Sequence, residues 1–239
     1  MRRIAVIPAR GGSKRIPRKN LREFHGRPML SYAIEAAAAS GVFDHVLVST
    51  EDDEIASCAL RYGAAVPFRR PPELADDHST TTAVMADAVA ACARMGWHAG
   101  QFCCIYPAVP LLSADILVEA LRLLEADDCA YVFPVIRFAS PIQRALRRLP
   151  DGATRPFHPE FVSTRTQDLE PAFHDAGQFY WGRSAAWLAG LSPHEHGRTL
   201  VIPADRSVDI DTPADWARAE ALYATRREAE KPTTKGPSA

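Results

Sequence analysis

The sequence predicts an α/β fold with a mainly parallel sheet, and two patterns lead to this prediction. Apolar segments rich in Val, Ile and aromatic residues alternate with helical segments of about 10–15 residues as far as Val135. The segment QFCCIY (101–106) is apolar almost throughout, which is typical of a strand buried on both faces of a parallel sheet. Strand–helix–strand units with right-handed crossovers produce such an alternation.

The expected elements are assigned from apolar periodicity and from the Gly, Pro and capping residues at their ends. Strands are expected at 2–9, 44–50, 64–70, 101–106, 129–137, 177–182 and 199–203. Helices are expected at 28–41, 51–63, 82–96, 113–127 and 184–191, with a closing helix from 212 onward. The acidic run at the start of the second helix lies where the helix dipole favours it, and Ser49 or Thr50 is its expected cap.

One domain is expected over residues 1–225, followed by a disordered tail at 226–239 that has no apolar periodicity. Within the domain, the alternation breaks after Val135, and residues 137–176 are polar and Pro-rich. We expect this middle section to form a hairpin and loops that protrude from the core sheet, and not a second domain.

The composition is that of an ordinary globular protein, with 47% hydrophobic and 24% charged residues. A formal net charge of −1 gives no overall field that would attract nucleic acid or a membrane surface. No apolar stretch approaches the ~20 residues that a membrane span needs, and the apolar start is too short for a signal peptide. A cytoplasmic location is therefore expected.

The cysteines predict neither a disulfide framework nor a metal site. There are five of them, an odd number, and no two form a C-x-x-C pair. Cys103 and Cys104 are adjacent in an expected strand, so their side chains should point to opposite faces of the sheet. We expect all five to be small buried hydrophobes in a reducing compartment.

A cationic loop follows the first expected strand. Residues 9–20 carry two glycines and five Lys or Arg side chains, although the chain as a whole is nearly neutral. Ligands of open α/β sheets bind where strands end, and glycines let backbone amides approach an anion closely. We therefore expect the loop to bind polyphosphate through Arg10, Gly11, Gly12, Lys14 and Lys19.

Lysine usage also singles out this loop. Of the four lysines in the chain, two lie in the expected tail, so Lys14 and Lys19 are the two in the folded body. Retaining Lys in an Arg-rich chain indicates a need for a compact, flexible ammonium group. The alternative is a solvated basic loop. The loop matches neither G-x-G-x-x-G nor G-x-x-x-x-G-K-[ST], which argues against dinucleotide-dependent redox chemistry and P-loop hydrolysis.

Four separated motifs carry a resemblance to a known family. They are IPARGGSKRIPRKN (7–20), GRPMLSYAIEAA (26–37), FRRPPELADDHSTT (68–81) and DIDTPADW (209–216). In this order they resemble the CMP-sialic acid synthetases, the acylneuraminate cytidylyltransferases, over nearly the whole chain up to Tyr223. The resemblance implies a Rossmann-like nucleotidyltransferase domain, a homodimer, and a CTP-dependent transfer of CMP to a nine-carbon sugar acid.

The resemblance also implies roles for particular residues. Arg10, Lys14 and Lys19 would hold the reacting phosphates, and Ala9, Asn20, Arg70 and Thr81 would bind the nucleotide. Glu73 is a weaker candidate because it may equally be a turn residue. Tyr106 is also assigned to nucleotide binding. It stands in YPAVP (106–110), where the sialic acid enzymes carry QPTSP, and this departure points to a branch of the family with another sugar.

Asp209 and Asp211 are the expected ligands of Mg²⁺. They are two residues apart, so in an extended segment both carboxylates point to the same side, and hard oxygen ligands are those that Mg²⁺ prefers. The alternative is that Asp211 or Thr212 caps the helix that begins at Pro213. Capping alone does not account for Asp209.

A second polar cluster is expected to bind the sugar acid. Arg144 or Arg165 could hold its carboxylate in a bidentate pair. Further candidates are Gln143, Gln167, Asp168, His174, Gln178 and Tyr180, although His174 could also be an ordinary surface or core histidine. The section at 137–176 is thus assigned to sugar binding and dimerisation. The segments SPIQRAL (140–146) and RTQDLEPAFHDAGQFYWG (165–182) most resemble the branch that activates pseudaminic acid.

The sequence therefore predicts an enzyme that transfers CMP to pseudaminic acid and releases pyrophosphate. An enzyme for N-acetylneuraminic acid, legionaminic acid or an eight-carbon sugar acid is the first alternative, because the phosphate loop and the Asp pair would serve any of them. A non-catalytic nucleotide sensor is the second, and it would not need the Asp pair.

Overall fold

A computed structural model describes residues 1–76 and 78–229 of the chain. Within these residues the main sheet has seven strands, six of them in the order β11-β6-β10-β5-β1-β4, with β9 paired to β6 outside this path. The bounds are β1 (Arg3–Pro8), β4 (His45–Ser49), β5 (Gln101–Ile105), β6 (Tyr131–Arg137), β9 (Phe173–Asp175), β10 (Phe179–Arg183) and β11 (Gly197–Val201). Two short ribbons complete the strands, β2 (Glu23–Phe24) with β3 (Arg27–Pro28) and β7 (Leu146–Arg148) with β8 (Thr154–Pro156).

The strand directions confirm the predicted α/β fold with a mainly parallel sheet. Strand β1 is parallel to β4 and β5, and β11 is parallel to β6, whereas β10 runs antiparallel between β5 and β6. The strand predicted at 64–70 is wrong. Ala65 makes an isolated bridge to Leu47, and the chain then leaves the sheet at Pro67, which has no amide proton for a ladder.

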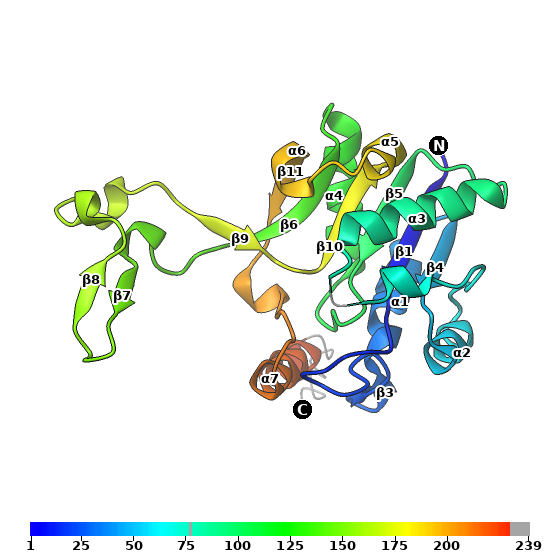
Figure 1. The fold of residues 1–239 in the computed structure, drawn as a ribbon, viewed down its shortest axis with the longest axis horizontal. Coiled ribbons are helices and arrows are strands. Elements are labelled where there is room, and N and C mark those ends of the chain that lie inside the picture. The colour runs from blue at the N-terminus through cyan, green and yellow to red at the C-terminus, as the bar shows by residue number, and fades with distance from the viewer. Residues whose placement is uncertain (77, 230–239) are drawn as a thin grey trace, which may run out of the picture.

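Helices cover both faces of the sheet (Figure 1). The α-helices are α1 (Met29–Ser40), α2 (Asp53–Arg61), α3 (Thr81–Arg94), α4 (Ala114–Ala126), α5 (Ser184–Leu188), α6 (Pro193–His196) and α7 (Pro213–Ala229). Short 3₁₀ turns occur at Pro72–Leu74, Ile142–Arg144, Pro159–Phe161, Thr166–Asp168 and Ala204–Arg206. Cys103 packs in the core beneath α1 and α4 and Cys104 in the core beneath α3 and α5, which confirms that adjacent side chains face opposite ways.

A third apolar cluster brings the C-terminal helix to the N-terminal loop. Ile16 from the loop, Phe24 from β2 and Trp216 from α7 are all buried in it, together with Ile210. The segment that contains Asp209 and Asp211 is therefore fixed beside the cationic loop by apolar packing. Helix α7 continues to Ala229, four residues beyond the predicted domain end at 225, and the rest of the predicted tail lies outside the described residues.

Residues 137–176, which we call the arm, extend away from the body of the molecule (Figure 1). The arm contains the ribbon β7–β8, whose residues are all exposed, and it joins the sheet through β9. Large apolar side chains of the arm are exposed to solvent: Phe138, Ile142, Leu146, Phe157, Val162 and Phe173.

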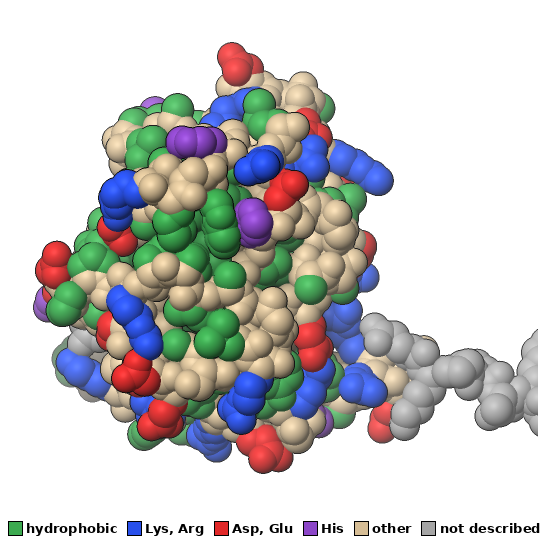
Figure 2. Space-filling view, turned by 90° about the vertical axis from the view of Figure 1, so that its right-hand side faces the viewer, with side chains coloured by type: hydrophobic (Ala, Val, Ile, Leu, Met, Phe, Trp, Pro, Cys, Tyr) green, Lys and Arg blue, Asp and Glu red, His purple; other side chains and the backbone are tan. Residues whose placement is uncertain are grey.

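The face of the body opposite the arm carries Lys, Arg, Asp and Glu side chains interspersed with apolar ones (Figure 2). No helix in the described part of the chain combines the length and the apolar character that crossing a membrane requires.

Candidate active site

A cleft of about 630 Å³ opens beyond the carboxyl ends of β1 and β5. This is the position at which open α/β sheets bind ligands. Its walls come from the cationic loop, from the loop before α3, from the residues after β5 and from the segment before α7. Its lining includes Arg10, Ser13, Lys14, Arg15, Lys19, Asn20, Arg70, Asp76, Ser79, Thr81, Tyr106, Gly177, Asp209, Ile210 and Asp211.

The cationic loop is anchored at its ends and lies open at its centre. Arg18, in a left-handed conformation, donates to Asp52 and Glu54 at 2.6 Å each, which ties the loop to the start of α2. Asn20 donates its Nδ2 to the carbonyl of Arg10 at 3.0 Å. Its Oδ1 is buried without a hydrogen-bond partner. A buried polar atom without a partner is costly, so Asn20 Oδ1 is a candidate acceptor for a hydrogen bond from a ligand in the cleft.

The two glycines of the loop differ from each other. The amide of Gly11 donates to Glu51 Oε1 at 2.7 Å, and a Cβ at this position would lie 2.6 Å from Asp52 Oδ2. Gly11 is therefore required for packing against the start of α2, and its amide is not directed at the cleft as the sequence had suggested. No atom lies within 4 Å of a Cβ built at Gly12, whereas Ala9 is fully buried and outside the lining.

Asp209 and Asp211 both reach the cleft, on either side of the buried Ile210. Lys19 donates its ammonium to the Ile210 carbonyl at 2.7 Å, and Arg15 pairs with the Asp211 carboxylate at 2.9 Å. Burial and the neighbouring charge of Asp211 raise the pKa of Asp209. The pair thus holds negative charge that a further cation would stabilise.

The cap of α7 is formed by two other residues. The Asp215 carboxylate accepts from the Thr212 amide at 2.8 Å, and Thr212 Oγ1 accepts from the Asp215 amide at 3.3 Å. Thr212 is the cap that the sequence offered as an alternative, and its partner Asp215 was not predicted. The side chains of Asp209 and Asp211 take no part in this cap, so the capping explanation does not apply to them.

The donor set at this pair fits Mg²⁺. Carboxylate oxygens are hard ligands, and Mg²⁺ is commonly held by one or two protein carboxylates together with substrate phosphates and water. Among the described residues there is no group of three or more His, Cys, Asp or Glu side chains that could hold a metal ion without a substrate.

The opposite wall of the cleft combines a buried cation with two hydroxyl groups. Arg70 is 4% exposed and donates to the carbonyl and hydroxyl oxygens of Ser49, and burial lowers the pKa of its guanidinium. The hydroxyl groups of Thr81 and Tyr106 lie 3.0 Å apart, and burial raises the pKa of Tyr106. Glu73 lies outside the lining, and its carbonyl accepts from Ser79.

The structure adds Ser13, Arg15, Asp76 and Ser79 to the residues considered from the sequence. Asp76 orders the loop before α3, because its Oδ1 accepts from the amide and the hydroxyl of Ser79, both at 2.7 Å. The pattern D-x-x-S is a local signal of such a turn. Arg15 is one of the five cations of the loop, and the sequence does not show that its side chain reaches Asp211.

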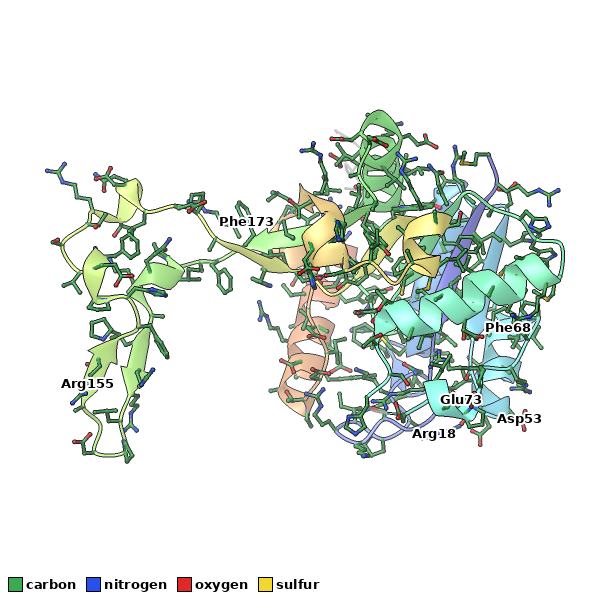
Figure 3. All side chains as sticks on the ribbon, turned by 45° about the horizontal axis from the view of Figure 1, so that its top comes forward. Arg18, Asp53, Phe68, Glu73, Arg155 and Phe173 are labelled. Carbon is green, nitrogen blue, oxygen red and sulfur yellow. The ribbon has the colours of Figure 1, made fainter. Side chains whose placement is uncertain are left out.

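The predicted sugar-binding residues lie outside this cleft. Gln143, Arg144, Arg165, Gln167 and Asp168 belong to the arm, where Gln143 donates to the Glu170 carbonyl and Arg144 to that of Thr164. Arg155 on the arm is far from Arg18 and Glu73 beside the cleft (Figure 3).

His174, Gln178 and Tyr180 lie at the base of the arm, and each bonds to another protein group, although Gln178 Oε1 is buried without a hydrogen-bond partner. His174 bonds to the Asp175 carbonyl, Gln178 donates to the Arg206 carbonyl, and Tyr180 donates to the Asp175 carboxylate. Within the described residues, none of the predicted sugar-binding side chains therefore lines the cleft.

Comparisons with known proteins agree with this architecture. A family model described as cytidylyltransferase matches residues 4–144. The chain is 41% identical over 229 residues to a pseudaminic acid cytidylyltransferase of Campylobacter jejuni, covering 95% of this chain and 99% of that one. It is 31% identical to a CMP-N,N'-diacetyllegionaminic acid synthase of Legionella pneumophila, covering 96% and 99%, respectively.

Solved structures show the same fold. A CMP:2-keto-3-deoxy-manno-octonic acid synthetase complexed with CTP superposes with a TM-score of 0.70 at 18% identity, covering 95% of this chain and 100% of that one. A 4-diphosphocytidyl-2C-methyl-D-erythritol synthase of Anaerococcus prevotii gives 0.63 at 11% identity, covering 93% and 98%. The predicted nucleotidyltransferase fold and the resemblance stated from the motifs are confirmed, and the chain belongs to the cytidylyltransferase family.

Proposed function

We propose that this enzyme transfers CMP from CTP to pseudaminic acid and releases pyrophosphate. One observation carries the proposal: a single cleft at the ends of β1 and β5 joins the loop cations to the Asp209–Asp211 pair. Polyphosphate transfer needs positive charge on the phosphates and carboxylates for a metal ion, and here both face the same space. The relatives named above supply the choice of nucleotide and acceptor.

The proposed chemistry is an in-line displacement at phosphorus. The anomeric hydroxyl of the sugar acid attacks the α-phosphorus of CTP, the new oxygen–phosphorus bond forms, and the bond to the pyrophosphate breaks. Arg10, Lys14 and Lys19 neutralise the phosphates, while Asn20, Arg70, Thr81 and Tyr106 hold the nucleoside. The hydroxyl proton passes to solvent. Such transfers depend on positioning and charge stabilisation and need no covalent intermediate.

Asp209 and Asp211 are the proposed holders of Mg²⁺. When bound, the ion would neutralise phosphate charge as a Lewis acid. The raised pKa of Asp209 and the absence of both carboxylates from the α7 cap support this assignment. Arg15 and Lys19, which lie 2.9 and 3.7 Å from Asp211, respectively, mark the place where positive charge is already favoured.

We propose that residues 1–225 form one catalytic domain. We also propose that the protein is a homodimer whose two chains meet through the arm. The arm exposes Leu146 at 58%, Val162 at 58% and Phe157 at 52%, while its ribbon has no core of its own in the described residues. Apolar side chains gathered on one protruding segment mark an interaction surface. A second copy would also bring polar arm residues such as Arg144 and Arg165 to a site that one chain leaves without them.

The test is pyrophosphate release from CTP and Mg²⁺ with a panel of sugar acids. We expect the highest kcat/KM with pseudaminic acid, and much lower values with N-acetylneuraminic acid, N,N'-diacetyllegionaminic acid and an eight-carbon acid. A site that pairs with the hydroxyl groups of one substrate discriminates against analogues by up to ~10⁴–10⁵. A higher value with another acid would transfer the assignment to that acid, and CTP binding without turnover would favour a sensor.

A further inference from the structure

We propose that Asp175 is a positioning residue for this reaction, which holds two walls of the cleft in place without touching the substrates. The proposal rests on the function proposed above. Asp175 ends β9 and begins a turn formed by residues 175–178, which we call the Asp175 turn. The segment 165–182 that was singled out from the sequence contains this residue, but sequence reasoning assigned Asp175 no role.

The Asp175 carboxylate gathers three groups from different elements. Its Oδ1 accepts from the Gly177 amide at 2.7 Å, and its Oδ2 accepts from the Tyr180 hydroxyl at 2.5 Å. His194 of α6 approaches the same Oδ2 through Nε2 at 2.8 Å. A carboxylate that accepts from several donors forms stronger hydrogen bonds than a neutral acceptor, so it fixes their relative positions.

The first wall is held through Tyr180. Tyr180 is 6% exposed, and its ring packs edge-on against that of Tyr106 with centroids 5.8 Å apart. Tyr106 lines the cleft and meets Thr81 there. A buried phenol needs a partner, and Asp175 supplies it; without this partner the Tyr180 ring would lose the orientation that supports Tyr106.

The second wall is held through the backbone of the Asp175 turn. Gly177 lines the cleft with φ of +65°, and a Cβ at this residue would lie 3.8 Å from Asp209 Cγ. The Ala176 carbonyl accepts from Ser207 Oγ at 2.6 Å, and the Gln178 carbonyl accepts from the Tyr106 amide at 2.8 Å. The turn is thus bonded both to Tyr106 and to the segment that leads into Asp209.

The two walls carry groups with different roles in the proposed mechanism, since Tyr106 would hold the nucleoside and Asp209 would hold Mg²⁺. A displacement of about 1 Å in a positioning element can cost on the order of 10²-fold in rate. The N-terminal loop, by contrast, has an anchor of its own, because Arg18 donates to Asp52 and Glu54 at the start of α2. Loss of Asp175 should therefore affect turnover more than nucleotide binding.

The test compares Asp175→Asn, Tyr180→Phe and the double variant by pyrophosphate release, with calorimetric CTP binding to count competent sites. For Asp175→Asn we expect kcat to fall about tenfold or more, by misplacement of the cleft walls. The KM for CTP should change less than about threefold, and binding stoichiometry should stay that of the wild type. Adding Asp175→Asn to Tyr180→Phe should cost clearly less than it does alone, because contacting residues are coupled.

Asp128→Asn serves as the matched control, since Asp128 is exposed and distant in sequence from the cleft segments. It should leave kcat, KM and melting temperature unchanged. Wild-type kcat in Asp175→Asn, or effects of the two single variants that multiply in the double variant, would overturn the proposal. Turnover by the wild-type protein in the same assay tests the proposed function by itself. Failure of the proposed function is therefore distinguishable from failure of the role proposed for Asp175.

Discussion

Ile210 shows how a single residue places the charged groups on either side of it. It is 1% exposed and packs with Ile16, Phe24 and Trp216, while Asp209 and Asp211 face the cleft. Burying such a side chain contributes about 1.5–3 kcal/mol, which helps to offset the repulsion between the two carboxylates. The alternation of side chains in an extended segment then aims both carboxylates to one side.

At the residue scale, we predict that Asp209→Asn and Asp211→Asn separate activity from stability. Each should lower kcat by about 10²–10³, as expected for loss of a group that stabilises developing charge. Asp209→Asn should also raise the melting temperature, because desolvation and the neighbouring Asp211 carboxylate raise the pKa of Asp209 and so make its charge unfavourable. Pyrophosphate release and thermal unfolding measure the two effects, and a lower melting temperature together with wild-type turnover would contradict both.

At this scale the sequence predicted which charged residues line the cleft, but it did not predict which residues contact one another. The Asp209–Asp211 spacing, the two lysines and Arg70 all mark the cleft, because the ends of parallel strands converge. Gly11 was misread, since its need for glycine comes from Asp52, a residue 41 positions further along the chain. Tyr180 faces Asp175 because β9 and β10 both pair with β6, which periodicity alone does not specify.

At the scale of elements, the N-terminal end of helix α2 holds the cationic loop through side-chain contacts. Asp52 caps the helix by accepting from the Glu54 and Ile55 amides at 2.9 Å each, and it pairs with Arg18 at 2.6 Å. Ser49 and Thr50, the predicted caps, do not cap α2: Thr50 accepts from the Asp52 amide, and Ser49 contacts Arg70. The boundary was misplaced because the acidic run offered several capping residues in succession.

Asp52→Ala should therefore destabilise the fold by about 0.5–2 kcal/mol, the usual cost of losing an N-cap. Burial opposes the shift, but the Ile55 amide and Arg18 lower the pKa of Asp52 below its ordinary value. A lowered pKa means that the stabilisation is present above the unfolded value of about 3.9 and is lost as the pH falls through the folded value. Urea unfolding of both proteins should show a difference at pH 7 that shrinks below about pH 4.

Asp53→Ala is the neighbouring control for this measurement. Asp53 contributes an exposed ion pair with Arg69, and such pairs are worth about 0–1 kcal/mol. Equal destabilisation by both variants would show that Asp52 acts as a surface charge and not as the cap of α2.

At the scale of the whole molecule, the body and the protruding hairpin of the arm were predictable, but the positions of the polar residues of the arm were not. Strand–helix alternation fixes the layers of a parallel sheet, because crossovers of one hand allow few arrangements. The predicted third strand does not form, because the chain leaves the sheet at Pro67, and the eight sugar-binding candidates lie in the arm and at its base and not at the cleft. Short polar turns carry little periodicity, so the sequence does not show where their side chains point.

The exposed apolar residues of the arm lead to a prediction on assembly. We expect the wild type to be a dimer in sedimentation equilibrium, and Leu146→Asp combined with Val162→Asp to be a folded monomer with reduced turnover, because a charge in an apolar contact is costly. Leu60→Asp on α2 is the matched control, since Leu60 is 61% exposed but distant from the arm, and it should remain dimeric. A monomeric wild type at micromolar concentration would refute the prediction.

The ion pair between Arg15 and Asp211 joins the cationic loop to the segment before α7, and it can couple the binding of an anion to the binding of a cation. Arg15 is 67% exposed and can turn toward an arriving polyphosphate, whose charge exceeds that of one carboxylate. The departure of its guanidinium removes a counter-charge from Asp211, so the attraction of that carboxylate for another cation rises once the anion has arrived. By reciprocity, a cation that replaces Arg15 at Asp211 leaves the guanidinium available and strengthens the hold on the anion. A partner exchange of this kind would make the binding of anion and cation cooperative.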